Sequence, residues 1–184
     1  MTHASTLEGS APIALRFAAR ELASLTGPVA IPDRTRLVHL QLRRFAGCPI
    51  CNLHLRSFAK RHDELVAARV LEVAVFHSSE AALREVEREL PFPVVPDPER
   101  VLYDELGVGT SARAMLDPRA MFAAARAMAS GAAVNPTAGS GDGSFGLPGD
   151  FLIAPDGEVV ALHRGKHADD QWSVDELLAL VASR

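Results

Sequence analysis

Cys48-Pro49-Ile50-Cys51 contains both cysteines of this 184-residue chain and stands between an apolar stretch and a helical pattern. Cys48 falls at the start of the predicted helix, where unpaired N–H groups and the helix dipole lower the pKa of a thiol. Pro49 suits the first helical position, where a missing N–H costs nothing. A second thiol three positions on can attack the first sulfur and close a disulfide. The spacing predicts redox chemistry, with Cys48 as nucleophile at the exposed helix end and Cys51 as resolving thiol on the buried face.

The same cysteine spacing can also form half of a structural zinc site, which needs four ligands. His54 extends the pattern to C-x-x-C-x-x-H, but the chain has no third cysteine to continue it. Other histidines could complete such a site only through the fold, and they are scattered: His39, His62, His77, His163 and His167. We therefore expect neither a metal nor an organic cofactor, and keep a metal-bound or structural cysteine pair as the alternative.

Strands and helices alternate on both sides of this motif. Apolar residues alternate with His39 and Gln41 and predict a strand over 36–42, and the apolar run 70–76 predicts a second, buried strand. The other expected elements are helices after Ser78-Ser79, Asp97-Pro98 and Asp117-Pro118, a short strand at 92–95, a hairpin of 151–153 with 159–162, and a last helix capped by Ser173 and Glu176. This order predicts an α/β fold with a mixed sheet and helices on both faces.

Two segments are predicted to lie outside the core pattern. Apolar residues at helical spacing over 13–25 predict an amphipathic helix, in an N-terminal helical extension that spans 1–35. The main domain is expected over 36–184, with an insertion over 109–147 before the closing hairpin. The insertion carries an Ala-rich helix over 118–130 and a surface loop over 131–146. Either helix could form a homodimer contact.

Composition and charge limit the classes of partner and the cellular compartment that we expect for this protein. The net charge is −4, and the basic residues are scattered among acidic ones, which argues against a nucleic-acid partner. No apolar run approaches the length of a membrane span, and residues 1–12 show no signal-peptide pattern, so we expect a cytosolic protein with no membrane contact. In that compartment a CxxC pair is more often catalytic or metal-binding than a structural disulfide.

Three stretches, 42–51, 95–108 and 147–153, resemble the alkyl hydroperoxide reductase/thiol-specific antioxidant branch of the thioredoxin fold, in its peroxiredoxin-like group. The resemblance covers 36–184 and implies a thioredoxin-like fold. It also implies reduction of hydroperoxides or disulfides through a dithiol/disulfide cycle. Thioredoxin, glutaredoxin or a low-molecular-weight thiol would then restore the dithiol. Pro148 matches the proline of the thioredoxin-fold loop that packs against the CxxC sulfurs.

The chain departs from the peroxiredoxin signature Pro-x-x-x-Thr-x-x-Cys. Counted back from Cys48, the Pro and Thr positions hold Gln41 and Phe45, and the Arg that the family has before the penultimate strand aligns with Pro148. The resemblance points to peroxide as the substrate, whereas the missing Thr and Arg point to disulfide exchange. Both substrates stay open, beside the alternative of a non-catalytic thioredoxin-fold binding protein.

Arg43 and Arg44 end the strand that leads into the motif. Strand alternation sends their side chains to opposite faces, so one of them could lower the thiol pKa or hold an anionic transition state. Arg44 is the candidate for that role. His39, in the middle of the strand, is expected to be a core histidine with satisfied hydrogen bonds.

Overall fold

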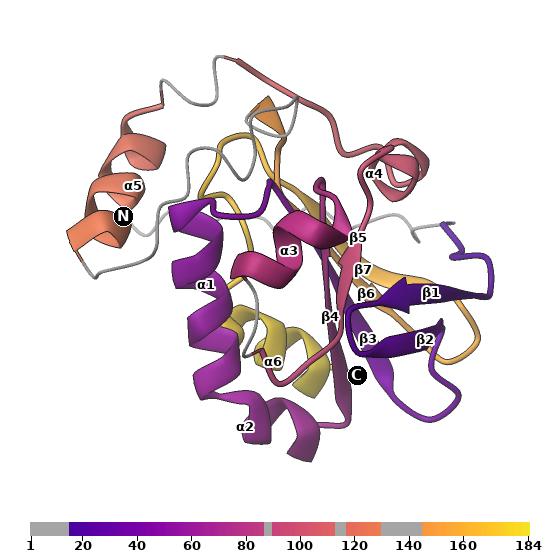
Figure 1. Cartoon of the computed structure of the whole chain (residues 1–184). Coiled ribbons are helices and arrows are strands. Elements are labelled where there is room, and N and C mark those ends of the chain that lie inside the picture. The colour runs from indigo at the N-terminus through magenta and orange to yellow at the C-terminus, as the bar shows by residue number, and fades with distance from the viewer. Residues whose placement is uncertain (1–14, 87–89, 113–116, 130–144) are drawn as a thin grey trace, which may run out of the picture.

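The computed structural model describes residues 15–86, 90–112, 117–129 and 145–184 (Figure 1). Its elements follow the expected alternation from the first core strand onward. In chain order they are β1 (Arg20–Ser24), β2 (Gly27–Ile31), β3 (Leu37–Arg43), α1 (Pro49–Lys60), α2 (His62–Ala67), β4 (Val70–Phe76), α3 (Glu80–Val86), β5 (Val94–Pro96), α4 (Val101–Glu105), α5 (Pro118–Ala129), β6 (Gly149–Ile153), β7 (Val159–Arg164) and α6 (Val174–Ala182).

The main sheet has the strand order β5-β4-β3-β6-β7. β3 is the central strand, parallel to β4 and antiparallel to β6. Its register places His39 opposite Glu72 on β4, and Gln41 opposite Asp150 on β6. The sheet is therefore mixed, and its central strand leads directly into the CxxC motif.

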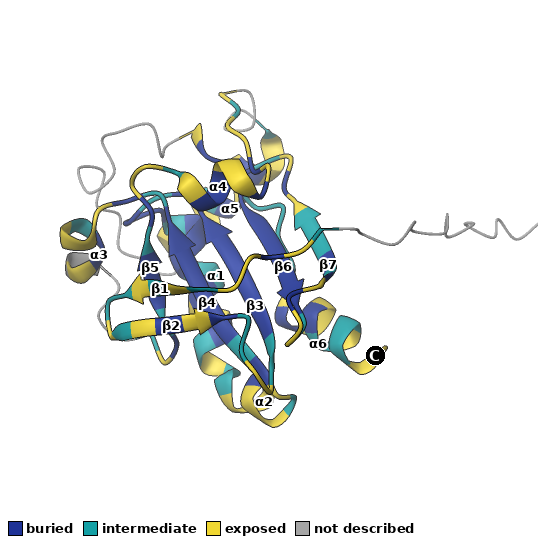
Figure 2. Cartoon of the chain, turned by 90° about the vertical axis from the view of Figure 1, so that its right-hand side faces the viewer, coloured by how far each residue is buried: buried dark blue, intermediate teal, exposed yellow. Residues whose placement is uncertain are grey.

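The sheet separates two apolar clusters (Figure 2). On one face α1 and α6 contribute residues such as Leu55, Phe58 and Leu177. On the other face α4 and the β1–β2 hairpin contribute Leu102 and Ile31. We call these the helix face and the hairpin face. Because α4 covers the second face, the expectation of helices on both sides of the sheet is confirmed.

The helix predicted over 13–25 is wrong for the described residues, because 20–31 form the antiparallel hairpin β1–β2. Gly27 does not stop a helix but begins β2 directly after the turn, at φ +124°, a conformation that favours glycine. Val29 and Ile31 then offer a partner strand and pack on the hairpin face. The apolar residues have helical spacing, but the segment pairs as a strand because β2 follows β1 after only a short turn.

The insertion contains a helix, α5, as predicted, and the surface loop predicted over 131–146 lies almost wholly outside the described residues. α5 contacts α1 beside its first turns (Figure 1). Its buried positions are all alanines, Ala120, Ala123 and Ala127, whereas Met121 and Phe122 are exposed. Within the described ranges, none of the helices has both the length and the apolarity that a membrane crossing requires.

Candidate active site

The CxxC motif lies at the end of a tight connection from β3 to α1. Gly47 has φ +77°, and the backbone N–H of Ala46 donates a hydrogen bond of 2.9 Å to the Ser78 hydroxyl, which ties the turn to the end of β4. Cys48 then caps α1, and Pro49 occupies the first turn. The helix start predicted at the motif is confirmed, and it aims the backbone N–H of Cys51 at the Cys48 sulfur over 3.4 Å.

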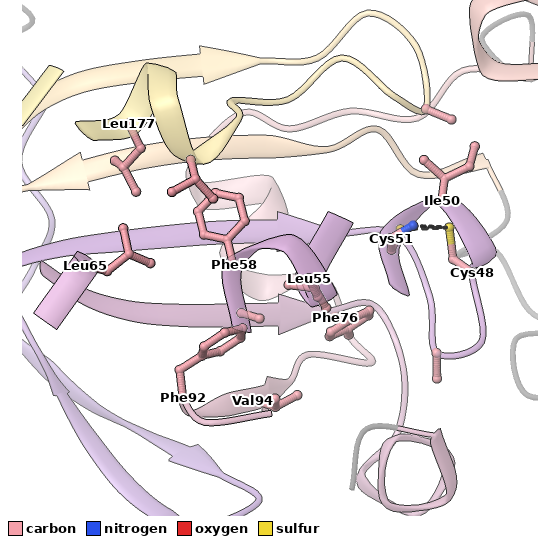
Figure 3. Packing of buried hydrophobic residues seen from close by; sticks show 14 of the residues in the cluster. Cys48, Ile50, Cys51, Leu55, Phe58, Leu65, Phe76, Phe92, Val94 and Leu177 are labelled. Atoms are coloured by element: carbon pink, nitrogen blue, oxygen red, sulfur yellow. Dashed lines mark hydrogen bonds between the residues drawn. The ribbon is translucent and has the colours of Figure 1, made fainter. Parts of the chain in front are cut away.

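The two sulfurs face each other as free thiols (Figure 3). The Cys51 thiol donates to the Cys48 sulfur with 2.7 Å between the two Sγ atoms. Both residues are buried, at 0% and 1% exposure. The prediction that Cys48 lies at an exposed helix end is therefore wrong. Its position at the start of α1 is right, but residues from other elements of the helix-face cluster cover it.

Electrostatics separates the roles of the two thiols. Burial alone would raise the Cys48 pKa, but the hydrogen bond from Cys51 and the charge of Arg44 outweigh burial and lower the pKa to about 7. The Cys51 pKa is raised well above its ordinary value, by burial and by the neighbouring Cys48 sulfur. The sulfur at the helix start is thus the one that ionises near neutral pH.

The two adjacent arginines bind different partners. Arg44 places Nη1 3.8 Å from the Cys48 sulfur and is almost fully buried. Arg43 is buried among polar side chains instead. It donates to Gln41 Oε1 at 2.6 Å, to Gln171 Oε1 at 2.8 Å and to Asp150 Oδ1 at 2.5 Å. Arg44 is therefore the arginine that faces the thiols.

Arg43 belongs to a buried polar network on the helix face, and much of it was not anticipated from the sequence. His39 lies between Glu72 and Asp150, with ring nitrogens 2.8 Å and 3.2 Å from their carboxylate oxygens. Gln41 donates to the other Glu72 oxygen. Burial lowers the His39 pKa, but the two carboxylates overcome this effect and raise the pKa to about 9. His39 is thus a core histidine with satisfied hydrogen bonds, as expected, and it is also charged.

Pro148 lies at the same end of the sheet as the motif. It is buried, and it precedes Gly149, which pairs with Leu42 near the end of β3. Its carbonyl accepts the N–H of Gly165 at 2.9 Å. Among the described residues the only cis peptide bond is Ile31-Pro32, so the Leu147-Pro148 bond is trans.

The alternative of a metal-bound cysteine pair would need further ligands such as His54. His54 lies on α1 with its ring 4.8 Å from that of Phe58, and burial lowers its pKa well below the ordinary value. Across 15–86, 90–112, 117–129 and 145–184, no group of three or more His, Cys, Asp or Glu side chains is arranged to hold a metal ion.

Solved structures place this architecture in the thioredoxin-like class. The peroxidoxin BcpB of Mycobacterium tuberculosis matches with a TM-score of 0.63 and 18% identity, over 91% of this chain and 94% of that one. Peroxiredoxin Q of Xanthomonas campestris matches with a TM-score of 0.62 and 16% identity, over 90% of each chain. A protein of Chlorobium tepidum described as a putative thiol:disulfide interchange protein DsbE has a TM-score of 0.56 and 20% identity, over 90% and 95%. At these identities the likeness shows the fold.

The family follows from the sequence itself. Residues 55–167 match the family described as AhpC/TSA antioxidant enzyme. This match spans more than half of the chain, so the protein belongs to the AhpC/TSA antioxidant enzyme family, and its class is that of oxidoreductases. The matched residues begin just after Cys51. A search of curated proteins found no match.

Proposed function

We propose that this protein is a thiol-dependent reductase of small hydroperoxides that cycles the Cys48–Cys51 pair between dithiol and disulfide. The observation that carries the proposal is the sulfur pair, 2.7 Å apart, with the Arg44 guanidinium 3.8 Å from Cys48. A pKa of about 7 makes a large fraction of Cys48 thiolate at neutral pH. Pro148 is proposed to shape the site from the neighbouring strand end.

The first step is attack of the Cys48 thiolate on a peroxide oxygen. The S–O bond forms as the O–O bond breaks, so Cys48 becomes a sulfenic acid and the other oxygen leaves as an alkoxide or hydroxide. That leaving oxygen takes up a proton and departs as alcohol or water. Arg44 lies where it can stabilise the anionic thiolate and the negative charge that develops on the leaving oxygen.

The second step closes the disulfide. The Cys51 sulfur attacks the Cys48 sulfenic sulfur, and the hydroxyl leaves with the Cys51 proton as water. An external reductant then returns the protein to the dithiol. Two thiol groups of that reductant, from one dithiol protein or from two small molecules, are oxidised to one disulfide. Thioredoxin, glutaredoxin or a low-molecular-weight thiol is the proposed reductant. The proposed setting is the cytosol, where such thiols are kept reduced.

Burial of the sulfurs favours a small peroxide over a protein disulfide as the substrate. Both thiols are at most 1% exposed, and a peroxide presents a two-atom target, whereas disulfide exchange needs a third sulfur in line with the pair. Disulfide reduction remains the second candidate, because the CxxC pair can take part in thiol–disulfide exchange without a bound peroxide.

The test compares the parent with Cys48→Ser and Cys51→Ser variants. Peroxide consumption with each thiol reductant, and reduction of a small disulfide, are followed at matched protein concentration. We expect Cys48→Ser to lose peroxide turnover. Cys51→Ser should keep a single stoichiometric oxidation of Cys48 but turn over slowly with dithiol reductants. A Cys48→Ser variant with the parent's peroxide turnover would overturn the proposal.

The alternative of a non-catalytic protein is tested on the same samples. A thiol titration in a graded redox buffer should show one reversible two-electron couple, with two thiols lost together. A metal-bound sample in which that couple is missing would favour a structural role for the cysteine pair.

A further inference from the structure

We infer that Tyr103 and Arg43 are positioning residues: together they fix the end of β3 so that the next residue, Arg44, is held against the Cys48 sulfur. The inference rests on the proposed function for its meaning, but its geometry is independent of turnover. Neither side chain touches the thiols in the contacts described above. Both act through the backbone of the strand that delivers Arg44.

The Arg43 side chain is fixed from the helix face. Its guanidinium is 0% exposed and donates to three separate acceptors, two amide oxygens and the Asp150 carboxylate. A planar guanidinium with three directional partners has little rotational freedom. Asp150 is held in turn by the Trp172 N–H at 3.1 Å and by His39. These partners come from β3, β6 and the segment before α6. We call Arg43 and these partners, together with Tyr103, the clamp.

The Arg43 carbonyl is fixed from the opposite face. The hydroxyl of Tyr103, which is fully buried, donates to that carbonyl and lies 3.1 Å from the carbonyl of Val75 on β4. Tyr103 is itself anchored, because the Asp97 carboxylate accepts the N–H groups of Val101 and Leu102 at 2.9 Å each at the start of α4. The end of β3 is therefore held by its side chain on one face and by its carbonyl from the other.

This arrangement matters because the Arg44–Cys48 contact is sensitive to small displacements. Arg44 is the residue directly after the clamped carbonyl, and its own carbonyl accepts the His77 N–H at 3.2 Å. The attraction between the guanidinium and a thiolate falls with separation and falls further if water enters. A shift of the strand end would weaken that attraction without removing a group from the site.

The experiment measures the ionisation of Cys48 directly. In a Cys51→Ser background, thiolate absorbance is followed against pH for the parent, Tyr103→Phe and a control, Ile153→Val. The control removes buried apolar volume from the same cluster as Tyr103 but sits opposite Val38, near the other end of β3. We expect Tyr103→Phe to raise the midpoint by about half a unit, which is roughly a threefold loss of thiolate below the midpoint. The control should keep the parent midpoint.

A second variant covers the case in which Tyr103→Phe does not fold. Gln171→Met removes one acceptor of Arg43 at a half-buried position while keeping the length of the side chain. If Tyr103→Phe folds, its midpoint decides, and otherwise the midpoint of Gln171→Met decides. An unchanged midpoint, or an equal shift in Ile153→Val, overturns the inference. A parent protein that does not turn over peroxide would instead count against the proposed function. The titration is independent of that result, because it needs no substrate.

Discussion

The two faces of the central sheet are built differently, although both are buried. On the hairpin face Val38, Leu40 and Leu42 of β3 belong to a largely apolar cluster. On the helix face three residues of the same strand are polar or charged: His39, Gln41 and Arg43. Figure 2 shows β3 and β4 buried along most of their length. One strand thus supplies ordinary packing to one side and a buried ionic network to the other.

The difference teaches where rigidity near the thiols comes from. Apolar packing is non-directional and tolerates small shifts, but charged hydrogen bonds fix angles as well as distances. The network balances two carboxylates, Glu72 and Asp150, against His39 and Arg43, and all four side chains are 0% exposed. The helix face therefore holds the Arg43 side chain in one orientation, beside the Tyr103 hydroxyl that holds the Arg43 carbonyl from the hairpin face. Removal of one charged partner of the network is expected to destabilise the protein strongly.

The largest effect is expected from breaking the network. Asp150→Ala leaves Arg43 and His39 buried without their shared carboxylate, and removing one partner of a buried ion pair costs about 3–5 kcal/mol. Urea unfolding of the reduced protein measures the loss. On the hairpin face, Ile153→Val should cost only about 1 kcal/mol. Equal losses in the two variants would contradict the contrast between the faces.

A second, smaller effect is pH dependence of stability on the helix face. The raised pKa of His39, about 9, means that its contribution is complete below its ordinary pKa of 6.5 and is lost as the pH rises through 9. The contribution is on the order of 3 kcal/mol. Unfolding should be measured against pH in a Cys48→Ser, Cys51→Ser background, because the lowered Cys48 pKa gives a slope of opposite sign.

The control for this slope is His39→Gln, which cannot titrate and should flatten the profile between these pH values. The imidazolium donates from both ring nitrogens to carboxylates, so its deprotonation removes one of two charged hydrogen bonds. A parent profile as flat as that of the variant would show that His39 is neutral in the folded protein.

The smallest effect is expected on the hairpin face, from overpacking. A Cβ at Gly149 would lie 2.7 Å from Val108 Cγ2 and 3.2 Å from the Phe151 ring. Gly149→Ala should therefore cost about 1–3 kcal/mol in thermal or urea unfolding. Adding Val108→Ala provides the missing space, so the double variant should lose less than the sum of the two single losses. Simple additivity would show that the crowding lies elsewhere.

Much of this contrast could be predicted from local patterns. Period-two alternation in β3 places His39, Gln41 and Arg43 on one face, and a lone Glu72 in the otherwise apolar strand β4 signals a buried partner. The start of α1 at the CxxC motif and the capping box of α6 follow from their residues, because both depend on neighbours in sequence.

The remainder depends on contacts between distant segments. Asp150, Tyr103 and Gln171 reach Arg43 from three other parts of the chain, and no spacing in the sequence brings them together. Cys48 is buried for the same reason, since its cover comes from other elements of the fold. The β1–β2 hairpin shows the converse case, in which apolar spacing suited a helix and an adjacent strand decided the outcome.

The separation of Arg43 from its acceptors also bears on when the protein acquires its reactivity during synthesis. Asp150 follows Arg43 by 107 residues and Gln171 by 128, so both leave the ribosome long after Arg43 and shortly before α6. A nascent chain that has exposed its cysteines has not yet acquired the groups that hold the neighbouring strand end. On the inferred role of the clamp, the Cys48 thiol reaches its lowered pKa only after Gln171 has been synthesised and has reached Arg43.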